Sequence, residues 1–143
     1  MLRWLGKFFG FGGPPDSGAR GETLAAEWLQ RERGFAIVAR NWRSPRDRRD
    51  ELDLVCRDGE ALVFVEVKTR SAEALVPGVY AVDARKKRVL LRSARAYLAG
   101  LRAKPVTVRL EVVEVALPAK GAAGAPQILH FEKVALFPKY FQP

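Results

Sequence analysis

Residues 51–70 read ELDLVCRDGEALVFVEVKTR, and this stretch decides the fold. Two apolar runs flank Asp58-Gly59, and Asp-Gly between such runs is the strongest short signal for a β-hairpin with a type I′ turn. We therefore predict antiparallel strands over 51–57 and 61–68. A two-residue turn at 58–59 pairs residues 57, 55, 53 and 51 with residues 60, 62, 64 and 66.

Because side chains alternate across a strand, this pairing divides the hairpin into two faces. The face away from the core ends in charges: Asp53 is the diagonal neighbour of Glu66, and Lys68 points the same way. Every side chain on the opposite face is apolar, so that face belongs to the core: Leu52, Leu54, Cys56, Ala61, Val63, Val65 and Val67.

Carboxylates crowded on a half-buried sheet face repel one another and are costly to bury unpaired. A divalent cation would relieve both costs, and hard oxygen ligands suit Mg²⁺ or Mn²⁺. Such a cation could support phosphodiester hydrolysis by lowering the pKa of a bound water, with Lys68 orienting the water or offsetting phosphate charge. The alternative is a structural cluster in which Lys68 and an arginine neutralise Glu66 and Asp53.

The single cysteine and the single histidine exclude several other chemistries. Cys56 alone cannot form an internal disulfide or a Cys-rich zinc site, and its apolar surroundings indicate a core residue. His130 has no second imidazole with which to form a histidine metal cluster. Any catalysis must therefore depend on carboxylates and lysine.

The chain on either side of the hairpin completes an α/β pattern. Capping residues and apolar spacing predict a helix from 16 to 33, a strand over 35–39 and an arginine-rich loop over 40–49. A second helix is expected from 83 to 101, then strands near 106–117 and 127–136. The order α-β-β-β-α-β-β predicts a mixed β-sheet flanked by helices. We expect residues 1–15 to form a flexible aromatic and basic leader and residues 16–143 to form a single domain.

The charge balance favours a polyanionic partner. Lys and Arg number 25 against 16 Asp and Glu, a net charge of +9, which suits DNA, RNA or an anionic membrane surface. No apolar run is long enough to span a membrane and no secretory signal is evident, so we expect a cytoplasmic protein. The residues expected to hold the phosphate backbone are Arg43, Arg48, Arg49, Arg70, Lys86, Lys87 and Arg88.

Asp53 followed by Glu66-Val67-Lys68 resembles the PD-(D/E)XK signature of restriction-endonuclease-like nucleases. More closely, GARGETLAAEWL (18–29), the stretch NWRSPRDRRD (41–50) with the hairpin, and the Lys-rich helix ending AYLAGL resemble the YraN-like family of uncharacterised bacterial proteins. The chain departs from that family's pattern at Asp50, where glycine is usual, and at Leu110-Glu111, where Phe-Asp is usual.

The resemblance implies a restriction-endonuclease-like fold with Asp53, Glu66 and Lys68 at the metal-binding and catalytic positions. It also implies that Glu22, which by its sequence position alone is a solvated first-turn residue, is an additional metal ligand. We therefore expect a metal-dependent nuclease or nuclease-like protein acting on DNA or RNA. The alternatives are a nucleic-acid-binding module without activity and a membrane-surface or partner adaptor that uses the aromatic leader.

Overall fold

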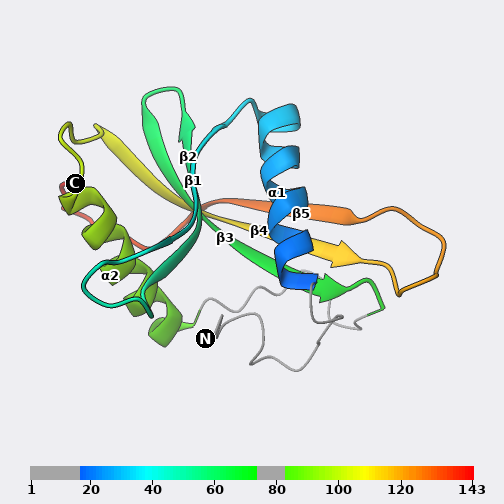
Figure 1. The fold of residues 1–143 in the computed structure, drawn as a ribbon. Coiled ribbons are helices and arrows are strands. Elements are labelled where there is room, and N and C mark those ends of the chain that lie inside the picture. Colours follow the sequence, from blue (N-terminus) through cyan, green and yellow to red (C-terminus); the bar gives the residue numbers. More distant parts are fainter. Residues whose placement is uncertain (1–16, 74–82) are drawn as a thin grey trace.

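The computed structural model describes residues 17–73 and 83–143, and its elements follow the expected order (Figure 1). The leader expected over residues 1–15 lies outside the described residues. No helix of the described part is long and apolar enough to cross a membrane. The elements are α1 (Ser17–Arg33), β1 (Ala36–Arg43), β2 (Glu51–Asp58), β3 (Ala61–Ser71), α2 (Ala84–Ala99), β4 (Thr107–Leu117) and β5 (Gln127–Val134).

The strands form one five-stranded mixed sheet in the order β1-β2-β3-β4-β5. Neighbours are antiparallel except β3 and β4, whose parallel pairing requires the crossover that contains α2. The two helices cover different faces of the sheet, and each face has its own apolar core. Leu29 of α1 packs with Val65 and Val113, whereas Leu90 of α2 packs with Phe64 and Val112.

The β2–β3 hairpin differs from the prediction by a shift of two residues in register. Asp58 pairs with Ala61 and Val55 with Phe64, so the turn is Gly59-Glu60 rather than Asp58-Gly59. Gly59 has a φ of 59°, while Glu60 is not among the residues with positive φ. A type II′ turn has positive φ only at its first central residue and favours glycine at that position. Gly59 takes that position when the turn is at 59–60, which accounts for the register that differs from the prediction. Because a shift of two preserves alternation, most side chains keep their predicted faces.

Leu52 is the exception on the apolar face. It packs in the α2-side core with Val55, whereas Leu54 packs in the α1-side core, so the alternation of β2 breaks at Asp53. The paired residues of β2 and β3 end at Leu54 and Val65. Beyond them, the Val67 N–H donates a hydrogen bond to Asp53 Oδ2 at 2.9 Å. The predicted charged face is also buried rather than half-buried over most of its length, because α2 covers it.

The arginine-rich loop is shorter than the predicted 40–49, because β1 extends into it. The edge strand β1 continues to Arg43 by pairing with β2 up to Glu51, so Arg40 and Arg43 lie in a strand. An edge strand tolerates such polar side chains because one side of it remains open to solvent. The remaining loop, residues 44–50, is closed by the Ser44 N–H, which donates to the Asp50 carbonyl at 2.9 Å.

Candidate metal and nucleic-acid site

Asp53 and Glu66 come together where β2 and β3 stop pairing. Glu66 is 4 % exposed, and the Asp53 carboxylate is held by the Val67 N–H. Burial raises the pKa of Asp53 well above its ordinary value, and repulsion from Glu66 and from Glu22 raises it further. Lys86 and the Val67 hydrogen bond oppose this rise without cancelling it. The predicted carboxylates therefore share one site that has an excess of negative charge.

Glu22 reaches this site because α1 approaches β3 unusually closely. Gly21 is buried, and a Cβ at that position would lie 1.9 Å from Thr69 Oγ1 and 3.0 Å from Thr69 Cβ. Only glycine permits this approach without a shift of the helix or the strand. Its neighbour Glu22, which is partly buried, is thereby close enough to Asp53 to raise the pKa of that carboxyl.

Lys68 follows Glu66 on β3 and is partly buried. Burial lowers the pKa of Lys68, and Lys86 and Arg70 lower it further, whereas Glu66 and Glu114 oppose the change. The register of β3 and β4 places Lys68 beside Glu114. The lysine that the sequence assigned to the water and the phosphate is thus next to the carboxylates and less basic than an ordinary lysine.

Lys86, which was expected to hold the phosphate backbone, is instead buried against Glu66. Its Nζ lies 3.0 Å from Glu66 Oε1, and the residue is 5 % exposed. The side chain of Asp83, the N-cap of α2, accepts a hydrogen bond from the Lys86 N–H at 2.8 Å. Lys86 precedes Val89 by three residues and Leu90 by four, which places it on the buried stripe of the helix. That spacing could have revealed its burial in advance.

Glu114 is a second residue that sequence reasoning missed. It is 4 % exposed, and Arg70 Nε contacts its Oε1 at 2.8 Å. Its other oxygen, Oε2, is buried without a hydrogen-bond partner among the described residues. Only the parallel register of β3 and β4 places Glu114 beside Lys68, and no local pattern in the sequence reveals that register.

The residues expected to contact nucleic acid fall into two groups. Arg48 and Arg88 are exposed, the Arg49 side chain is 83 % exposed while it contacts Asp47, and Lys87 is partly exposed. The others are mostly buried in ion pairs with acidic neighbours: Arg43 with Glu51 at 3.2 Å, Arg70 with Glu114, and Lys86 with Glu66. Of these seven residues, only Arg48, Arg49, Lys87 and Arg88 can contact a partner without first breaking a buried ion pair.

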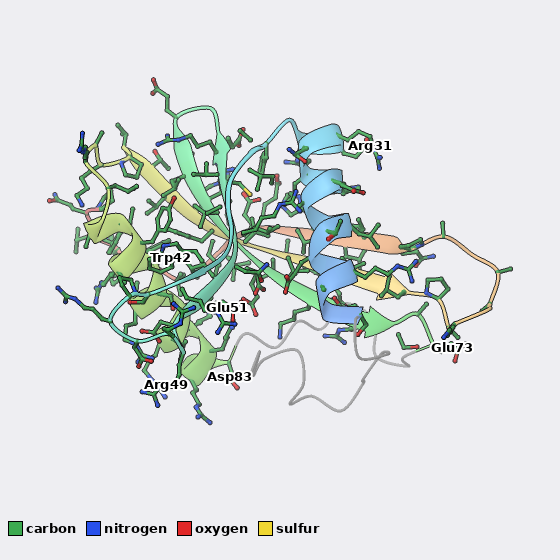
Figure 2. The ribbon with its side chains drawn as sticks, in the orientation of Figure 1. Arg31, Trp42, Arg49, Glu51, Glu73 and Asp83 are labelled. Carbon is green, nitrogen blue, oxygen red and sulfur yellow. The ribbon has the colours of Figure 1, made fainter. Side chains whose placement is uncertain are left out.

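The exposed arginines of the loop and of α2 belong to one surface because the loop is fixed to the helix. Arg92 of α2 donates two hydrogen bonds to the buried Asp50 carboxylate, at 2.7 and 2.6 Å. Figure 2 labels Arg49 on this loop and Asp83 at the start of α2. Arg88 lies on α2 one turn before Arg92 and one residue after Lys87, so this basic surface includes both the loop and the first half of the helix.

A second cluster on the α1 side of the sheet combines Glu111, His130 and Glu132, with one potential ligand atom of each within 4.8 Å of the others. Its charges are already paired. Glu111 accepts from Arg109 Nε at 2.9 Å and contacts His130 Nε2 at 2.7 Å, and Glu132 pairs with Arg33. A metal on Nε2 would require a proton on His130 Nδ1, which is buried without a hydrogen-bond partner among the described residues. We assign a structural role to this cluster.

Burial raises the pKa of Glu111, but hydrogen bonds from His130 and Arg109 outweigh it and leave that pKa below its ordinary value. The pKa of Glu111 is lowered, whereas that of Asp53 is raised. This contrast distinguishes a cluster whose charges are all paired from a site with uncompensated negative charge.

The fold is that of a restriction-endonuclease-like α/β protein. It has a mixed sheet in the order β1-β2-β3-β4-β5, and it gathers Asp53, Glu66 and Lys68 where β2 and β3 stop pairing. The chain belongs to the uncharacterised protein family UPF0102, whose model matches residues 21–115, a range that includes every residue of the site from Glu22 to Glu114. This membership confirms the resemblance to YraN-like proteins.

Three relatives named UPF0102 protein illustrate the similarity. One from Beutenbergia cavernae is 49 % identical over 117 residues, 82 % of this chain and 93 % of the relative. One from Anaeromyxobacter dehalogenans is 41 % identical over 126 residues, 85 % of this chain and 88 % of the relative. One from Symbiobacterium thermophilum is 47 % identical over 98 residues, 68 % of this chain and 80 % of the relative. These names assign no activity.

Proposed function

We propose that the protein is a metal-dependent nuclease that hydrolyses phosphodiester bonds of DNA or RNA in the cytoplasm. The observation that carries this proposal is the unbalanced charge around Asp53, whose pKa is raised by burial and by two neighbouring carboxylates. A fold gains nothing from holding like charges together in a poorly solvated place. The arrangement makes physical sense if a cation binds there during function.

The donor set suits Mg²⁺ or Mn²⁺. Asp53 and Glu66 would each supply a carboxylate oxygen, and Glu22 of α1 would supply a third ligand oxygen. Such cations prefer oxygen ligands and retain several waters beside one or two carboxylates. When bound, the metal would lower the pKa of a coordinated water and offset charge on the phosphate.

Lys68 would act on the water and the phosphate. Its ammonium group lies close enough to Glu66 for their charges to interact, and its lowered pKa makes proton exchange easier than for an ordinary lysine. As a cation it can also donate hydrogen bonds to a phosphate oxygen. Glu114, on the neighbouring strand, would help to hold Lys68 toward the site.

The substrate would be held by the exposed basic surface of the 44–50 loop and α2, with Arg48, Arg49 and Arg88 contacting phosphates. The net charge of +9 adds long-range attraction for a polyanion. Contacts of this kind carry little sequence information, and they weaken steeply as salt rises.

A second candidate function is a nucleic-acid-binding module without catalysis. The Lys86–Glu66 ion pair favours it, because a lysine that permanently neutralises Glu66 would keep a cation from that carboxylate. The adaptor alternative depends on the aromatic leader, which lies outside the described residues.

A cleavage assay separates these functions. Single-stranded, double-stranded and branched DNA and RNA would be incubated with the protein in Mn²⁺ or in EDTA, and binding would be measured in parallel at rising salt. We expect Mn²⁺-dependent cutting that falls about 10²–10⁴-fold in Lys68→Ala, with binding retained. Lys120→Ala, on an exposed residue between β4 and β5 that has no role in the proposed mechanism, is the control. Salt-sensitive binding without cutting would support the module, and absence of binding to every substrate would contradict both functions.

A further inference from the structure

Lys86 is a buried lysine that neutralises a proposed metal ligand. It is 5 % exposed and Glu66 is 4 % exposed, with 3.0 Å between Lys86 Nζ and Glu66 Oε1. The Lys86 charge also acts on Asp53 and on Lys68. One ammonium group is therefore close to every charged group of the site on β2 and β3.

The position of Lys86 makes it a competitor of the metal. A carboxylate oxygen that accepts a hydrogen bond from an ammonium group cannot at the same time give that lone pair to Mg²⁺ or Mn²⁺ without a rearrangement. Two cations held at the same carboxylate also repel each other, and more strongly in a poorly solvated site than in water. Metal binding at Glu66 Oε1 would therefore displace the Lys86 ammonium group, and binding at the other oxygen would be weakened by repulsion from it.

Lys86 also lies beside a surface suited to phosphate. It occupies the first turn of α2, between the exposed Arg85 and the partly exposed Lys87, with Arg88 exposed one residue further on. Four flexible methylene groups connect its ammonium group to a backbone that the Asp83 cap holds in place. A phosphate group near this turn would offer the ammonium group an alternative anionic partner close to the metal position.

We propose that Lys86 is a tethered counter-ion that occupies Glu66 until a phosphate of bound nucleic acid draws it away, so that nucleic acid increases the affinity of the site for a divalent cation. This inference rests on the proposed function. The coupling is reciprocal, and the metal therefore increases the affinity for nucleic acid by the same factor.

Calorimetric titration with Mn²⁺, with and without a phosphorothioate DNA duplex that resists hydrolysis, tests the coupling. The variant is Lys86→Met, which removes the charge and retains an unbranched side chain. Lys120→Met is the control, because it removes the same charge from an exposed residue between β4 and β5 that is not assigned to the site or to the basic surface. Titration of the duplex alone corrects for Mn²⁺ that binds to the DNA.

We expect the duplex to lower the Kd for Mn²⁺ of the wild type about tenfold. Lys86→Met should bind Mn²⁺ about tenfold more tightly than the wild type without duplex, and gain little from the duplex. Lys120→Met should retain the wild-type response to the duplex. If Lys86→Met does not fold, Lys86→Gln should show the same tightening, because a neutral amide competes less with the metal.

Equal Mn²⁺ affinity in wild type and Lys86→Met, or an equal duplex effect in both, would overturn the inference and leave the proposed metal site intact. Absence of Mn²⁺ binding in all variants, with and without duplex, would overturn the proposed function together with the inference.

Discussion

Two clusters of charge lie on different sides of the same sheet, and they are built from similar parts. The site cluster comprises Glu22, Asp53, Glu66, Lys68 and Lys86, and the arginine–histidine cluster comprises Arg109, Glu111 and His130. Each contains a glutamate that is almost fully buried, Glu66 at 4 % and Glu111 at 1 % exposure. The pKa of Asp53 is nevertheless raised, whereas that of Glu111 is lowered.

The difference lies in how completely each carboxylate is paired. Both oxygens of Glu111 have a cationic or imidazole partner within 2.9 Å, and Arg109 is in turn paired with Asp58 at 2.7 Å. Asp53 has one backbone N–H and faces two other carboxylates. A buried acid therefore does not by itself mark a functional site; an acid that its neighbours leave uncompensated is the better indicator.

The largest effect is expected from Glu111→Gln, which removes the centre of the arginine–histidine cluster. Breaking a buried ion pair leaves its partners unpaired, so the variant should lose about 3–5 kcal/mol of unfolding free energy. For a domain of this size that corresponds to a fall in Tm of about 10 °C or more. Thermal unfolding of wild type and variant measures the loss.

Glu132→Gln is the control for that measurement. Glu132 pairs with Arg33, but its side chain is 45 % exposed, and exposed ion pairs contribute about 0–1 kcal/mol. A Glu111→Gln variant as stable as Glu132→Gln would contradict the structural role of the arginine–histidine cluster.

A smaller loss is expected from Gly21→Ala, which tests how Glu22 joins the site cluster. Alanine favours a helix interior over glycine by about 1 kcal/mol, so a gain in stability is the outcome expected from helix propensity alone. The contact with Thr69 opposes it, and overpacking costs about 1–3 kcal/mol. We expect a net loss in thermal unfolding, and partial recovery in the Gly21→Ala/Thr69→Ala double variant. A plain gain in stability would contradict the close approach of α1 to β3.

Asp53→Asn should stabilise the metal-free protein at neutral pH, by less than the preceding substitutions destabilise it. The amide still accepts the Val67 hydrogen bond but no longer repels Glu66 and Glu22. Because the folded pKa is raised, the cost of the charge exists above that pKa and disappears as the pH falls below the ordinary value of 3.8. Unfolding of both proteins across pH should show the gain only at the higher pH values.

The smallest effect concerns acid sensitivity. Glu111 has a lowered pKa, so it stabilises the fold at pH values above its ordinary value of 4.5 and loses this contribution as the pH falls through its folded pKa. The unfolding free energy of Glu111→Gln should therefore fall less steeply below pH 4.5 than that of the wild type. Parallel slopes in the two proteins would show that Glu111 does not carry this acid sensitivity.

The order of elements and the grouping of Asp53, Glu66 and Lys68 could be predicted from the sequence, because both follow from alternation and from turn residues. The exact pairing could not, since turns at 58–59 and at 59–60 preserve the same alternation. The burial of Lys86 follows from its helical spacing to Val89 and Leu90, whereas its charge alone indicates a phosphate contact. Glu114 joins Lys68 only through a parallel register formed over a crossover, which depends on tertiary packing.

Thermal unfolding of wild type and Asp53→Asn, with and without millimolar Mn²⁺, tests the account most directly. Binding to the folded state alone stabilises by RT ln(1 + [L]/Kd), about 2.7 kcal/mol when the metal is at 100 times its Kd. We predict that Mn²⁺ raises the Tm of the wild type and leaves Asp53→Asn, which is the more stable protein without metal, unchanged. A wild type that is insensitive to Mn²⁺ and that loses stability on Asp53→Asn would contradict the account.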